Sequence, residues 1–146
     1  MTANKLDKVV NVAHSSEKSS ASALRGSRQA HQQNEAQLQQ LEGFKAEYEA
    51  KLVEIAGGEG MAARQLQDYR AFLGRLNQAI AQQTDDTELS TVQLDEARDY
   101  WLQQSQRSRA LDHLVDLKQQ DLQQRQDRAE QKATDELAIA RHRGLA

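Results

Sequence analysis

The sequence predicts an all-α protein: a long two-stranded antiparallel coiled-coil hairpin with a C-terminal helical overhang. Three observations predict it. The chain of 146 residues has no proline, so nothing obliges a helix to break. Apolar residues recur at a 3,4 spacing on both sides of one glycine-rich segment, which is the pattern of a coiled-coil seam. The polar positions are filled mainly by Gln, Glu, Lys, Arg and Asp, which favour a long helix over a disordered chain.

The first helix is expected over residues 4–55. Its seam keeps one register throughout, as a coiled coil requires, although polar residues replace Leu or Val near its centre. The seam positions are Leu6, Val10, Ala13, Glu17, Ser20, Leu24, Ser27, His31, Asn34, Leu38, Leu41, Lys45, Tyr48, Leu52 and Ile55.

A turn is expected at residues 56–61, where Gly57, Gly58 and Gly60 lie close together. Glycine enters turn conformations without steric cost, including those with positive φ. A short connection makes the two helices antiparallel neighbours. With the tip centred near Gly58, residue i of the first helix should face roughly residue 117 − i of the second.

The second helix is expected over residues 62–141, with the same seam spacing in one register. In this pairing the N-terminal end of the first helix lies opposite Val115. Residues of the second helix from about 116 onward should therefore extend beyond the first helix as an overhang. An isolated polar helix is marginal in water, so we expect the overhang to become ordered on a partner. The seam positions are Leu66, Tyr69, Leu73, Leu76, Ile80, Gln83, Thr87, Ser90, Leu94, Ala97, Trp101, Gln104, Ser108, Leu111, Val115, Lys118, Leu122, Arg125, Ala129, Lys132, Glu136 and Ile139.

Composition and charge argue against several functional classes. Apolar residues make up 38% and aromatic residues 4% of the single domain expected over residues 1–146, too few for a multilayer core. The formal charge of -3 comes from interspersed signs, so a nucleic-acid partner is not expected. The chain has no cysteine, which excludes disulfides and thiolate metal sites and suits the reducing cytosol.

The sequence offers no candidate for catalysis, a cofactor or a metal. A two-helix hairpin has no interior for a dry pocket, and the glycine segment lacks the Lys-Ser/Thr pair of a phosphate loop. Only His31 and Glu35 have helical i, i+4 ligand spacing, which arises easily by chance. Met1–Ser20 has no apolar run typical of a signal peptide, and no segment is long enough to cross a bilayer. We therefore expect a soluble, non-enzymatic protein that reaches membranes only through partners.

Two stripes near the turn are the strongest functional candidates. Phe44 and Phe72 each lie one residue off the seam and should be partly exposed. Such stripes are usually core, but grouped exposed aromatic and aliphatic residues also form protein-docking patches, and both interpretations remain open. The two stripes consist of Gln37, Leu41, Phe44 and Tyr48, and of Phe72, Leu76, Ala79 and Gln83.

Several motifs, in order along nearly the whole chain, resemble the flagellar export protein FliJ family. They begin with Leu6–Ala13 and continue through Leu41, Phe44 and Glu47-Tyr48 to a glycine turn ending at Gly60. They then comprise Asp68–Leu73, Leu76, Ala79-Ile80, Trp101, Glu130–Lys132, Asp135–Ala138 and Arg141. Phe44 stands where the family commonly has tyrosine, and Gln83 where it can have histidine.

The resemblance implies a stalk of the flagellar type III export apparatus, active in flagellum assembly and motility. It implies three partners: the export ATPase ring, FliI; the export gate protein, FlhA; and the substrate chaperones. Localisation would be cytoplasmic and peripheral to the inner membrane. The gate-binding patch would be formed by Gln37, Leu41, Phe44, Tyr48, Phe72, Leu76, Ala79 and Gln83. By the stalk analogy, Leu6, Val10, Ala13, Leu122 and Glu136 would face the ring.

Two alternatives share the same helical pattern. One is a structural coiled coil that self-associates through its polar-interrupted seam. The other is the equivalent stalk of a virulence type III secretion system, which would have different partners.

Overall fold

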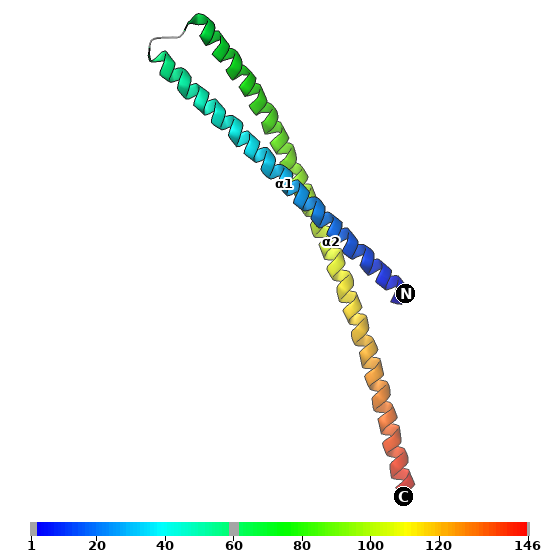
Figure 1. Cartoon of the computed structure of the whole chain (residues 1–146). Coiled ribbons are helices and arrows are strands. Elements are labelled where there is room, and N and C mark those ends of the chain that lie inside the picture. Colours follow the sequence, from blue (N-terminus) through cyan, green and yellow to red (C-terminus); the bar gives the residue numbers. More distant parts are fainter. Residues whose placement is uncertain (1–2, 59–61, 146) are drawn as a thin grey trace. The chain divides into compact units, whose positions relative to one another are not determined.

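The computed structural model describes residues 3–58 and 62–145 and contains two helices, α1 (Ala3–Ala56) and α2 (Ala63–Leu145) (Figure 1). Helix formation follows from the composition, since proline is absent and good helix formers such as Ala, Gln, Leu, Glu and Arg fill most positions. The two helices pack against each other, which confirms the predicted all-α hairpin.

The helix ends meet at the glycine segment. Beyond Ala56, the amide of Gly57 donates to the carbonyl of Val53 at 3.0 Å, and the amide of Gly58 donates to that of Ile55 at 3.2 Å. Neither glycine has a positive φ, so the positive φ considered for the turn is not used at these two positions. Gly60, which belongs to the same predicted turn, lies outside the described residues.

The chain divides into two compact units. Unit 1 comprises residues 1–18 and 103–146, and unit 2 comprises residues 19–102. In unit 2, His31 contacts Ser90, Asn34 contacts Gln83 and Tyr48 contacts Tyr69. Rising numbers in α1 thus meet falling numbers in α2, so the helices of this unit are antiparallel.

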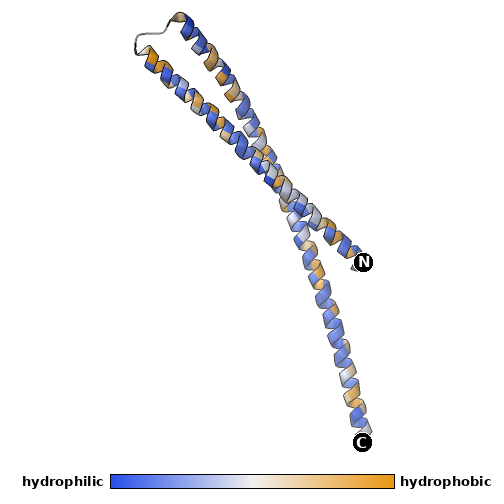
Figure 2. Ribbon diagram, viewed as in Figure 1, coloured by the Kyte–Doolittle hydropathy of each residue, from blue (hydrophilic) through white to orange (hydrophobic). Residues whose placement is uncertain are grey.

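The buried positions follow the predicted seam closely. In α1, every predicted seam position is buried or partly buried except Ile55, which is 37% exposed. In α2 the same holds from Leu66 to Val115. The buried apolar residues are Leu6 and Ala13 in unit 1 and Leu24, Leu76 and Leu94 in unit 2. Figure 2 shows apolar residues alternating with polar ones along both helices.

Small polar residues complete the core. Ser20 and Ser90 of unit 2, and Ser105 and Ser108 of unit 1, are buried. A serine at a helix contact lets the two backbones approach closely, but its hydroxyl must find a hydrogen bond. Within the described part of the chain, no buried side-chain nitrogen or oxygen lacks such a partner.

The predicted constant pairing is correct near the turn and wrong farther along α1. Asn34 meets Gln83 and Tyr48 meets Tyr69, as predicted. His31 was expected opposite Asp86 but bonds Ser90, one helical turn farther. Within unit 1, His14 bonds Asp112 rather than facing residue 103. A constant offset requires an uninterrupted seam of interlocking apolar side chains, which the polar and small residues here do not supply.

Candidate protein-docking surfaces

The aromatic patch, defined as the two stripes Gln37, Leu41, Phe44, Tyr48 and Phe72, Leu76, Ala79, Gln83, lies wholly in unit 2. Phe44 is 43% exposed, and Gln37 and Ala79 are also exposed. Leu76 is only 8% exposed and belongs to the core. The other four residues, Leu41, Tyr48, Phe72 and Gln83, are partly buried. The patch is therefore part of the helix contact, with one side accessible to solvent.

Aromatic rings connect the two stripes. The Tyr48 ring lies 4.5 Å from that of Phe72 at an interplanar angle of 47°, and 6.3 Å from that of Tyr69 at 62°. These centroid distances and tilts are the arrangement that aromatic quadrupoles favour. The contact brings Tyr48 of α1 and Phe72 of α2 together. Tyr69 was treated only as a seam residue, and sequence reasoning did not identify its place in this cluster.

A hollow of about 210 Å³ adjoins the cluster and is lined by Tyr48, Asp68, Tyr69 and Phe72. Asp68 was recognised in the sequence only as part of a motif. A usable signal was present, because Asp68 precedes Phe72 by four residues and therefore shares its helix face.

Beside the aromatic patch, a polar layer replaces the apolar seam, and we define it as His31, Asn34, Gln83, Thr87 and Ser90. The side-chain amide of Gln83 donates to Oδ1 of Asn34 at 2.9 Å and to its carbonyl at 3.1 Å. One His31 nitrogen, Nδ1, lies 2.9 Å from the Ser90 hydroxyl, and the other, Nε2, lies 3.0 Å from Glu35. These polar seam positions are thus satisfied across the helix pair, which favours one register.

The His31–Glu35 pair therefore has a structural explanation. The described residues contain no group of three or more His, Cys, Asp or Glu side chains arranged to hold a metal ion. His31 uses both ring nitrogens within the helix pair. Nothing in this cluster forms the concave, dry site that catalysis needs.

The residues proposed to face the ATPase ring fall into two groups within unit 1. Leu6 is 6% exposed and Ala13 1% exposed, so both serve the core, while Val10 is partly buried. Leu122 is 57% exposed, and Glu136 is also exposed. The first group holds the start of α1, and only the second offers accessible contacts.

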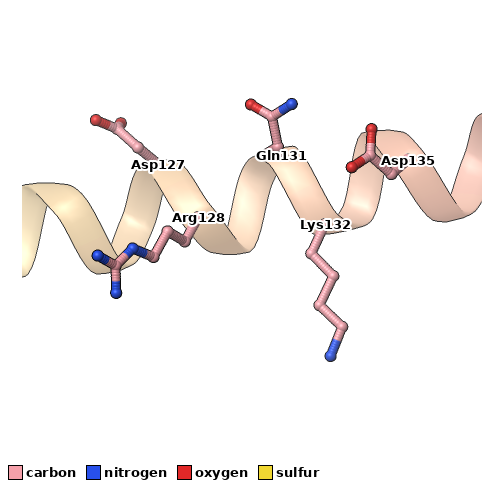
Figure 3. A pocket seen from close by; sticks show the side chains of 5 residues that line it. All are labelled: Asp127, Arg128, Gln131, Lys132 and Asp135. Carbon is pink, nitrogen blue, oxygen red and sulfur yellow. The ribbon is translucent and has the colours of Figure 1, made fainter.

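We define the overhang as residues 116–144 of α2, all of which are exposed. Around residues 127–135, acidic and basic side chains lie along different edges of the helix. Figure 3 shows Asp127, Gln131 and Asp135 along one edge, with Arg128 and Lys132 on the other. These five side chains border a hollow of about 330 Å³ formed by this one helix segment. A single helix cannot enclose a ligand, so this region is suited to a partner that supplies the opposite wall.

None of the described helices is long and apolar enough to cross a membrane.

Comparison with known families matches residues 2–144 to the family described as the flagellar FliJ protein. A search among curated proteins gave no match. The match spans nearly all of the chain and confirms the family resemblance seen in the sequence. The chain belongs to the FliJ family and is a component of the flagellar export apparatus.

Proposed function

We propose that the chain is a non-enzymatic stalk and adaptor that links the export ATPase FliI to the export gate protein FlhA. In this proposal, the end formed by the start of α1 and the overhang docks in the ATPase ring. The aromatic patch binds the gate. The protein reaches the inner membrane through these partners and assists delivery of substrates by their chaperones.

The observation that carries the proposal is that two surfaces of different chemistry lie in different units of a FliJ-family chain. The aromatic patch offers rings and apolar edges in unit 2. The overhang offers exposed charges, with Leu122 among them, in unit 1. An adaptor requires two such surfaces that different partners can occupy at once.

The overhang suits a protein partner because, within the described part of the chain, no other segment covers its helix from Asp116 onward. Its side chains are exposed, and the ion pair between Arg125 and Asp121, at 3.2 Å, joins residues one turn apart. Such exposed pairs add little stability. A ring lumen that surrounds the helix would bury Leu117, Leu122 and Ile139, which are 48%, 57% and 53% exposed.

The aromatic patch suits the gate because docking surfaces place aromatic anchors at their centre. Phe44 supplies an exposed ring, while Tyr48 and Phe72 supply ring edges held by their mutual contact. Leu76 contributes indirectly, since it is buried in the seam one helical turn after Phe72.

A pull-down with the matched export ATPase tests the proposal. The full chain and a version ending at Val115 are compared, and circular dichroism confirms that both are helical. Binding by the full chain alone is expected. If neither version binds, docking in the ATPase ring is refuted. If both bind equally, the overhang does not take part in ATPase binding.

Self-association is a second candidate that one observation favours. Leu89, Val92 and Tyr100 are 57%, 52% and 54% exposed, and their spacing places them on one face of α2 within unit 2. A second copy would bury this stripe. Sedimentation that shifts to higher mass with concentration would support self-association, and a constant monomer mass would exclude it. If the chain were instead the equivalent stalk of a virulence type III secretion system, it would not bind the flagellar partners FliI and FlhA.

A further inference from the structure

The hollow beside the aromatic cluster has the dimensions of a single side chain. Its volume is about 210 Å³, whereas small-molecule pockets usually hold about 300–1,000 Å³. Its walls come from both helices of unit 2, with Tyr48 on α1 and Asp68, Tyr69 and Phe72 on α2. The space is therefore a candidate socket for one residue of a partner.

Three of the four residues that line the hollow are aromatic. Aromatic faces carry partial negative charge and attract cations that lie within about 6 Å of the ring centroid. The chain itself provides an example, since the Lys51 ammonium lies 5.6 Å from the Tyr48 centroid. Lys51 does not line the hollow, so the socket remains open to a cation from outside.

The lining of the hollow is apolar, and the fourth residue, Asp68, brings a negative charge next to it. Its side chain is exposed, and among the described residues it has no ion-pair partner. A carboxylate beside aromatic rings matches arginine best, because the planar guanidinium stacks on a ring while it donates paired hydrogen bonds to the carboxylate. Lysine offers only a point charge, and an aliphatic side chain would leave Asp68 unused.

We propose that this hollow receives an arginine side chain from the protein that binds the aromatic patch. This inference rests on the proposed function, since it specifies the chemistry by which the gate protein docks. The guanidinium lies in the hollow against the Tyr48, Tyr69 and Phe72 rings, and the Asp68 carboxylate accepts its hydrogen bonds.

The test measures the affinity of the full chain for the cytoplasmic region of FlhA. Asp68→Asn keeps the shape of the side chain but removes its charge, and Phe72→Leu keeps apolar bulk but removes the ring. Asp85→Asn is the matched control, because Asp85 is an exposed carboxylate elsewhere in unit 2. Asp68→Asn and Phe72→Leu should each weaken binding about tenfold, and Asp85→Asn should leave it unchanged.

Arginine-to-glutamine changes across the FlhA surface then identify the partner residue. One such change should weaken binding to the wild-type chain and have little further effect on binding to Asp68→Asn, because both remove the same interaction. Circular dichroism of the variants confirms that the helices are intact.

The possible outcomes distinguish failure of the arginine socket from failure of gate binding by the aromatic patch. Loss of binding with Phe72→Leu but not with Asp68→Asn would overturn the arginine socket and leave gate binding by the patch standing. If the wild-type chain fails to bind FlhA, gate binding is refuted. Methylguanidinium then tests the socket alone by NMR, and shifts of the Tyr48 and Tyr69 rings that vanish in Asp68→Asn are expected. Absence of such shifts would overturn it.

Discussion

At the scale of single residues, burial rather than residue type decides which positions matter for stability and which for binding. Leu76 and Leu89 have the same side chain, yet Leu76 is 8% exposed and Leu89 is 57% exposed. The sequence predicted this difference, because Leu76 lies on the seam and Leu89 does not. Helical spacing places Asp68 on the same face as Phe72, but it could not reveal the hollow that both residues line, since the hollow depends on the distance between two helices.

Leu76→Ala should therefore lower the free energy of unfolding far more than Leu89→Ala. Truncating a buried leucine costs about 2–5 kcal/mol, and we expect about 2 kcal/mol here because a two-helix seam can partly collapse. Leu89→Ala should change stability by less than about 0.5 kcal/mol. Urea unfolding followed by circular dichroism measures both, and equal effects would show that the seam assignment is wrong.

Two helical glycines offer stabilising substitutions. Gly26 and Gly74 lie inside helices, and a Cβ built at either meets nothing within 4 Å. Replacing each with alanine should raise the free energy of unfolding by about 0.5–1 kcal/mol, because alanine loses less backbone entropy in a helix. A rise in the thermal midpoint for both variants is expected. A fall would mean that these positions require a conformation other than the helix.

At the scale of elements, periodicity predicted which face of each helix is buried but not the whole register. Except for Ile55, the seam residues up to Val115 are buried or partly buried because a second helix covers them. Leu122 and Ile139 continue the same spacing but are exposed, since a seam is buried only where it has a partner. Ser105 is buried although it lies one position off the seam, and residue spacing gave no signal of this.

The polar layer should specify register at some cost in stability. Gln83→Leu alone leaves Asn34 without its donor, which should cost about 1–3 kcal/mol. Adding Asn34→Leu should recover most of that loss, since two apolar side chains can then pack together. Chemical unfolding of the single and double variants measures this coupling, and strictly additive losses would contradict it.

The same double variant should lose its unique pairing. Because the chain has no cysteine, spin labels placed by Gln33→Cys and Glu88→Cys report the register of unit 2 directly. Wild type should give one narrow distance distribution, and the double leucine variant a broader one. An unchanged narrow distribution would show that apolar seam residues alone specify the register.

The overhang should exchange its amide hydrogens much faster than unit 2. Residues 116–144 are exposed, and a helix without tertiary contacts is marginal. Hydrogen exchange by mass spectrometry should show little protection there and strong protection around Leu94. If the overhang docks in the ATPase ring, adding the export ATPase should raise the protection of the overhang amides. Strong protection in the free protein would contradict this account.

At the scale of the whole molecule, different partners are proposed to bind different units of the chain. The aromatic patch belongs to unit 2 and the overhang to unit 1. The hairpin fold and family membership follow from the sequence, because long unbroken periodicity and ordered motifs determine both. The identity of each partner's contacts does not, because docking depends on a second surface that this sequence does not encode.

Variants in the two units should therefore have separable effects. Tyr48→Ala with Phe72→Ala should weaken gate binding while ATPase binding persists, and truncation after Val115 should do the reverse. Affinities for both partners, measured with circular dichroism on every variant, check this prediction. Equal loss of both partners with reduced helicity would identify Tyr48 and Phe72 as core residues only.

The most direct test of the adaptor role is a ternary binding measurement. The full chain is saturated with the export ATPase on a surface, and the cytoplasmic region of FlhA is then passed over it. FlhA should bind the preformed complex with an affinity close to that for the free chain, and Phe72→Ala should abolish this second step. Displacement of the ATPase by FlhA, or exclusion of FlhA from the complex, would contradict the adaptor role.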